Sequence, residues 1–136
     1  MYKLMLVFAA AFFSFILWII YLANTGGHSV FFDLIRGIPY GDKVGHFCLF
    51  GLLTFIATVG LKFKTFSLVN FRVYYGAALV LLFVIFEELS QAFIPARTLD
   101  SMDLLADFFG IGFASLFAYF INACRLKKTN EQAANS

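Results

Sequence analysis

The sequence is poor in charged residues, has only two cysteines, and has its basic residues in flanking loops rather than in a patch that would suggest nucleic acid. Charged residues make up 13% of the 136 positions, whereas about a quarter of an ordinary soluble domain is charged. Cys48 and Cys124 fall near opposite ends of predicted helices, so a disulfide between them is not expected. Without a basic patch, nucleic-acid binding is not expected either. The low content of charged residues is outside the range of an ordinary soluble domain.

Hydrophobic residues make up 62% of the chain, and 20 of them are phenylalanine. Apolar runs long enough to cross about 30 Å of hydrocarbon, at 1.5 Å per residue, occur four times. The predicted helices span about residues 4–23, 44–61, 73–93 and 104–124. The first run is longer than the core of a secretory signal, so we expect it to be retained as a helix.

These runs predict an all-α, polytopic membrane protein with four transmembrane helices in a lipid bilayer. Residues 1–128 would form a single transmembrane domain, and the polar residues 129–136 a disordered tail. The first outer loop has apolar side chains between polar ones at residues 30–38, which favours a segment lying along the membrane surface.

Basic residues predict the orientation of the chain. With four spans both termini share a side, and that side has 7 of the 10 lysines and arginines. Cytoplasmic loops carry the excess of basic residues. Both termini are therefore predicted to be cytoplasmic, with the 129–136 tail on that side.

Polar residues interrupt the apolar runs between residues 86 and 110. The third run has only 14 residues before its acids. These 14 residues span about 21 Å as a helix, which is less than the hydrocarbon thickness, so the helix must carry Glu87 and Glu88 into the membrane. Intramembrane acids cost about 2.5–3.5 kcal/mol at the bilayer centre and usually face a protein interior or a wet cavity. This stretch therefore predicts a polar site near one face of the membrane.

The fourth helix has a readable start, with Asp100 as N-cap and Asp103 three residues later. From Asp103, residues 107, 110 and 114 follow at helical spacing and share one face. Gly110 and Ala114 on that face would let a neighbouring helix approach closely.

In the second helix, the sequence GDKVGHF puts Asp42 and His46 four residues apart on one helical face. If the helices pack together, His46, Glu88 and Asp107 converge about one turn below the outer mouth. The candidate ligand-binding residues are Asp42, Lys43, His46, Glu87, Glu88, Gln91, Arg97, Asp103 and Asp107.

These residues resemble the VanZ-like family of small bacterial membrane proteins. The resemblance rests on DKVGHF, on EELSQ at the end of the third helix, and on Arg97, Asp103 and Gly110. Many family members have asparagine where this chain has Asp107. The resemblance implies a place in the bacterial cytoplasmic (inner) membrane and a role at the cell envelope, where the family is associated with resistance to teicoplanin. It names no reaction.

The leading hypothesis is an outward-facing polar pocket that recognises an amphiphilic envelope ligand, either a lipid-linked cell-wall intermediate or a lipid-bearing glycopeptide antibiotic. One alternative is an intramembrane hydrolase or transferase with Glu88 as base and His46 as its partner. Another is a non-catalytic protein that presents residues 30–38 to a membrane partner. A divalent metal on His46 and two carboxylates is conceivable but not favoured, because no HExxH-type spacing occurs. Small-residue faces are compatible with a dimer and do not require one.

Overall fold

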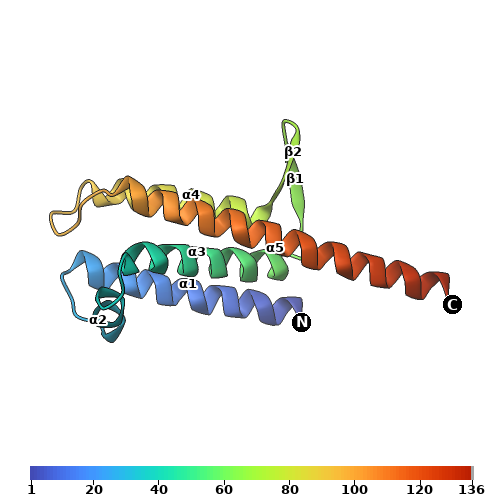
Figure 1. Cartoon of the computed structure of the whole chain (residues 1–136), viewed down its shortest axis with the longest axis horizontal. Helices are drawn as coiled ribbons and strands as arrows, with labels where there is room; N and C mark the ends of the chain where they lie inside the picture. Colours follow the sequence, from blue (N-terminus) through green and yellow to red (C-terminus); the bar gives the residue numbers. More distant parts are fainter. Residues whose placement is uncertain (136) are drawn as a thin grey trace.

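The computed structural model describes residues 1–135 and is mostly helical, as the composition predicts. The chain forms five helices and one hairpin within these residues (Figure 1). In order they are α1 (Tyr2–Asn24), α2 (Val30–Arg36), α3 (Gly41–Gly60), β1 (Thr65–Leu68), β2 (Phe71–Tyr74), α4 (Tyr75–Gln91) and α5 (Ser101–Ala134).

The four long helices α1, α3, α4 and α5 run alternately up and down along one common direction (Figure 1). Both ends of the chain and the hairpin lie toward one end of the bundle, and α2 and the α4–α5 connection lie at the other. Helix α3 packs against all three other long helices, most extensively against α5. Side chains at the start of α3 can therefore meet side chains from the end of α4 and the start of α5.

In the described part of the chain, three helices are long and apolar enough to cross a membrane, namely α1, α3 and α5. Helix α4 has 17 residues and includes the buried Glu87 and Glu88. Large apolar side chains face outward, for example Phe109, Phe113 and Phe120 along α5, whereas several acids are buried. This distribution is the reverse of a soluble domain and fits a membrane protein. The fourth span stays a prediction.

Helices α3 and α5 approach closely at glycines. A Cβ atom on Gly110 would collide with the backbone carbonyl of Phe47, and one on Gly51 would lie 3.1 Å from the Gly110 carbonyl oxygen. Asp103, Asp107, Gly110 and Ala114 are all buried. The prediction that these residues share an interior face is confirmed, and the small side chains permit the approach.

The structure differs from the sequence prediction between α3 and α4. Strands β1 and β2 pair antiparallel, with Thr65 opposite Tyr74 and Leu68 opposite Phe71, in the connection between the second and third predicted helices, for which no strand was predicted. Val69 in the turn has a φ of 55°, a region that β-branched residues seldom adopt. The hairpin makes α4 begin at Tyr75, two residues later than predicted.

Helix α5 continues to Ala134, beyond the predicted end at residue 124. Disorder was predicted for residues 129–136, yet residues 129–134 are helical; the last residue of that predicted tail, Ser136, lies outside the described residues. Cys48 and Cys124 are both free thiols, as predicted.

The predicted surface segment at residues 30–38 contains the short helix α2. Ser29 is its N-cap and accepts a hydrogen bond from the Phe31 N–H at 3.2 Å. Phe31 packs edge-on against Phe15 of α1, with ring centroids 5.3 Å apart. The helix leaves Val30 and Leu34 exposed, so an apolar surface remains at this end of the bundle.

Candidate functional site

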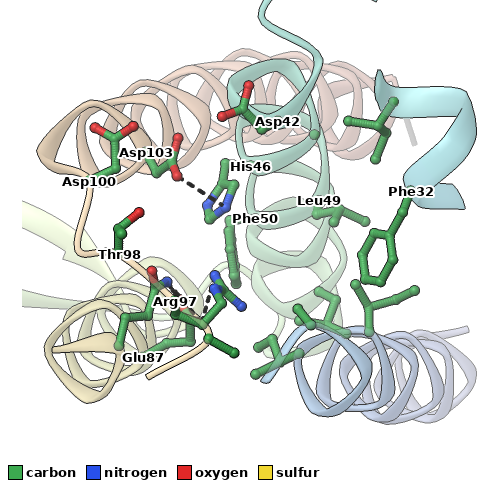
Figure 2. A pocket seen from close by; sticks show the side chains of 18 residues that line it. Phe32, Asp42, His46, Leu49, Phe50, Glu87, Arg97, Thr98, Asp100 and Asp103 are labelled. Atoms are coloured by element: carbon green, nitrogen blue, oxygen red, sulfur yellow. Dashed lines mark hydrogen bonds and ion pairs between the residues drawn. The ribbon is translucent and has the colours of Figure 1, made fainter. Parts of the chain in front are cut away.

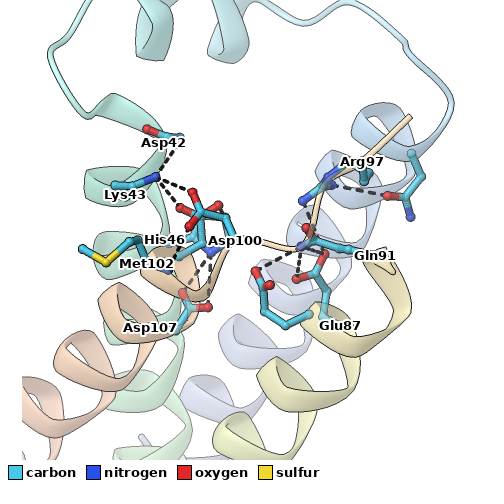
Figure 3. Close-up of polar contacts among 12 residues, drawn as sticks. Asp42, Lys43, His46, Glu87, Gln91, Arg97, Asp100, Met102 and Asp107 are labelled. Carbon is cyan, nitrogen blue, oxygen red and sulfur yellow. Dashed lines mark hydrogen bonds and ion pairs between the residues drawn. The ribbon is translucent and has the colours of Figure 1, made fainter. Parts of the chain in front are cut away.

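Lys43 connects the start of α3 to the start of α5. Its Nζ donates to Asp42 Oδ2 at 2.9 Å, to Asp100 Oδ2 at 3.0 Å and to Asp103 Oδ1 at 2.9 Å (Figure 3). Asp100 Oδ1 also accepts from the Met102 N–H at 2.9 Å, which confirms it as the N-cap of α5. The Lys43 ammonium and this backbone N–H hold the pKa of the Asp100 carboxyl below its usual range.

His46 lies one turn further along α3 and contacts two acids of α5. Its Nδ1 is 3.0 Å from Asp107 Oδ1 and 3.2 Å from Asp107 Oδ2, and its Nε2 is 3.9 Å from Asp103 Oδ2. Asp107 is completely buried. A carboxylate that orients an imidazole in this way can prepare it for proton transfer or for metal binding.

The end of α4 contributes a second polar group. Gln91 Nε2 donates to both Glu87 oxygens, at 3.1 and 3.0 Å, and to Glu88 Oε1 at 3.1 Å (Figure 3). Arg97, in the α4–α5 connection, has Nη2 3.7 Å from Glu87 Oε1 and donates from Nη1 to Asn24 Oδ1 at 3.3 Å. The two neighbouring glutamates therefore have different surroundings, because only Glu87 contacts the arginine.

A cavity of about 380 Å³ lies between these polar groups and α1. One side of it is apolar, with Phe32 of α2 and Leu49 of α3 among its residues, and the other is polar (Figure 2). The polar lining residues are Asp42, His46, Glu87, Gln91, Arg97, Thr98, Asp100 and Asp103. The cavity is thus amphipathic, because polar and charged side chains line one side of it and apolar side chains line the other.

The structure brings the nine predicted residues to one end of the bundle, although they do not share one surface. Six of them line the cavity: Asp42, His46, Glu87, Gln91, Arg97 and Asp103. Lys43 supports the acids beside it, and Glu88 and Asp107 do not line the cavity. A direct contact between the last two and a ligand in this cavity is therefore not available in this conformation.

Sequence reasoning missed three contributors, namely Thr98, which lines the cavity, Asp100 and Asn24. Asp100 was expected only as a helix cap, yet it also binds Lys43 and lines the cavity. Asn24 ends α1 and contacts Arg97 across 73 residues of sequence. Nothing in the local pattern around Asn24 indicates this contact, since it depends on how α1 packs beside the α4–α5 connection.

Among residues 1–135, two groups of side chains have the composition and proximity to hold a metal ion. The first is His46, Glu88 and Asp107, and the second is Asp42, Asp100 and Asp103. The second group already surrounds the Lys43 ammonium, which neutralises part of its charge.

Comparisons with protein-family models, with curated proteins and with solved structures found no match for this chain.

Proposed function

We propose that the chain is a VanZ-like, multi-pass protein of the bacterial cytoplasmic membrane that recognises an amphiphilic envelope ligand in its cavity. The ligand class is a lipid-linked cell-wall intermediate or a lipid-bearing glycopeptide such as teicoplanin. The observation that carries this proposal is the mixed lining of the cavity, with apolar side chains of α1 and α2 facing the charged ends of α3, α4 and α5. Such a lining suits a ligand with a hydrocarbon part beside an anionic or sugar-bearing headgroup.

Arg97 is the cavity cation best suited to an anionic headgroup. Lys43 is already surrounded by three aspartates, whereas Arg97 has a single, long ion pair with Glu87, at 3.7 Å, beside its hydrogen bond to the neutral Asn24. A guanidinium can also bind phosphate with two parallel hydrogen bonds. The apolar side of the cavity would then receive the first part of the lipid chain.

Arg97→Ala is expected to weaken binding of a polyprenyl pyrophosphate at least tenfold, because a hydrogen bond to a charged group contributes about 1.5–3 kcal/mol. Binding can be measured by native mass spectrometry of the protein in mild detergent. Arg36→Ala is the matched control, since Arg36 lies on α2, is exposed and does not line the cavity. Equal binding by wild type and a folded Arg97→Ala variant would remove Arg97 from the proposal, and wild-type protein that binds neither this lipid nor teicoplanin would reject it.

The proposed topology has four spans, with α4 as the third. Its 17 residues extend over about 26 Å, close to the hydrocarbon thickness. Glu87 and Glu88 point into the protein rather than to lipid, with 7% and 2% of their surface exposed, which reduces the cost of carrying them into a membrane. The cavity would then open near the outer face, with both termini in the cytoplasm.

A phosphatase that is active only outside the cytoplasm tests this topology. Fused after Ser136, it is expected to be inactive, and fused within the α2–α3 connection at Gly37 it is expected to be active, because basic residues concentrate on the side of the termini. The two fusions serve as controls for each other when their expression is matched. An active fusion at the C-terminus would contradict the orientation and the outward-facing cavity.

A further inference from the structure

Three potential metal ligands from three different helices meet next to the cavity. His46 comes from α3, Glu88 from α4 and Asp107 from α5. Each offers one ligand atom, and these atoms all lie within 4.8 Å of one another. The residues are far apart in the sequence, so no local spacing indicates the group. The meeting depends on the packing of α3 against α4 and α5.

Glu88 has an unused buried acceptor. Only 2% of the residue is exposed, its Oε1 accepts from Gln91, and its Oε2 has no hydrogen-bond partner among the described residues. Burying a polar atom without a partner costs roughly 1–3 kcal/mol, and more when the group is charged. A ligand at Oε2 would supply the missing interaction.

The nearby permanent cations are engaged with other acids. Lys43 binds Asp42, Asp100 and Asp103, and Arg97 is paired with Glu87. In the part of the chain that the structure describes, no lysine or arginine forms an ion pair with Glu88 or Asp107. Around the cavity and the three potential metal ligands, six carboxylates thus gather with two permanent cations, while Arg36 of α2 pairs with Asp33. The six are Asp42, Glu87, Glu88, Asp100, Asp103 and Asp107.

We propose that His46, Glu88 and Asp107 bind a divalent transition-metal ion, with Zn²⁺ the best match. One imidazole and two carboxylates suit Zn²⁺ better than Ca²⁺ or Mg²⁺, which prefer oxygen ligands alone. At zinc–ligand distances of about 2.0–2.2 Å, tetrahedral ligand atoms lie about 3.4 Å apart, and His46 Nδ1 and Asp107 Oδ1 are 3.0 Å apart. Glu88 offers its ligand atom within 4.8 Å of the other two. The ion would replace the hydrogen bond between His46 and Asp107, and the proton of that bond would be released to water on binding.

Three protein ligands leave one zinc position open, which is the usual composition of sites that also bind water or a substrate. His46 lines the cavity, so the ion would lie beside the space proposed for the amphiphilic ligand. The metal proposal does not depend on that ligand, because it rests on the residues around Glu88 alone.

The experiment is metal analysis of the full chain in mild detergent, after removal of metal with a chelator and reloading with ZnCl₂. Wild type is expected to retain about one zinc ion per chain. Glu88→Gln and His46→Asn are expected to lose at least tenfold in zinc affinity, because each removes a ligand. Glu87→Gln is the matched control, since it makes the same change at the adjacent glutamate, which faces Arg97, and it should retain zinc.

Cobalt provides a second measurement that does not rely on affinity. Co²⁺ bound to wild type is expected to give the visible absorption of a four-coordinate site, and this absorption should be absent from folded Glu88→Gln. Wild type that retains neither Zn²⁺ nor Co²⁺, or a Glu88→Gln variant that binds zinc as well as wild type, would overturn the proposal. Arg97→Ala should keep the metal while losing the amphiphile, so failure of one proposal is distinguishable from failure of the other.

Discussion

Replacing Lys43 with methionine is expected to lower the free energy of unfolding by about 2–3 kcal/mol, because it removes the cation shared by three carboxylates. Asp42, Asp100 and Asp103 each accept a hydrogen bond from Lys43 Nζ at 2.9–3.0 Å. Without the ammonium, like charges remain at the adjoining starts of α3 and α5. The loss is smaller than for a fully buried pair, since 60% of the Asp42 side chain is exposed and water can screen it.

The change can be measured by unfolding the purified protein with increasing SDS in mixed micelles, followed by circular dichroism. Lys128→Met provides the control, because it removes a lysine from the exposed end of α5, far from the aspartates. Adding Asp103→Asn to Lys43→Met should recover part of the loss, since one of the repelling carboxylates is then neutral. A Lys43→Met variant as stable as wild type would show that the three ion pairs contribute no net stability.

The sequence was sufficient to predict the helical class and the end of the bundle where polar groups gather. The prediction succeeded because the lengths of the apolar runs constrain where Glu87 and Glu88 can lie along the bundle. The N-cap at Asp100 could also be predicted from the sequence, because capping depends on residues within one helical turn. The convergence of His46, Glu88 and Asp107 followed from their similar depth in three helices.

The sequence could not show which way each side chain faces within that polar end. Successive residues on a helix point about 100° apart, so Glu87 and Glu88 at equal depth face different neighbours. Glu87 lines the cavity, whereas Glu88 approaches His46 and Asp107. Glu88 is thus not among the residues that line the cavity, and its contact with a ligand stays a prediction.

The hairpin and the long α5 were missed for a different reason. Residues 62–72 carry basic and aromatic side chains without the Asn-Gly or Asp-Gly pair that marks a tight hairpin. The turn uses Val69 with a positive φ instead. Residues beyond 124 lack apolar periodicity, and their helix continues from the preceding span, which supplies the first turns and so avoids a new nucleation step.

Gly110→Ala is expected to destabilise the protein by about 3 kcal/mol and to weaken the proposed metal site with it, because α3 and α5 touch through backbone atoms there. The added methyl group would collide with the carbonyl of Phe47, which is backbone and cannot rotate away. Phe47 follows His46, and Gly110 lies one turn beyond Asp107. Separating the two helices at this point therefore lengthens the 3.0 Å contact between His46 and Asp107.

Gly112→Ala is the matched control for this prediction. A Cβ atom at Gly112 would meet nothing within 4 Å, and alanine favours a helix over glycine by about 1 kcal/mol, so this variant should be as stable as wild type or more so. Unfolding in SDS compares the stability of the two variants directly. Zinc retention shows whether metal binding depends on the packing of α3 against α5. If Gly110→Ala loses stability but keeps zinc affinity, the metal ligands do not depend on the α3–α5 contact. If it loses neither, the close approach of the two helices at Gly110 is contradicted.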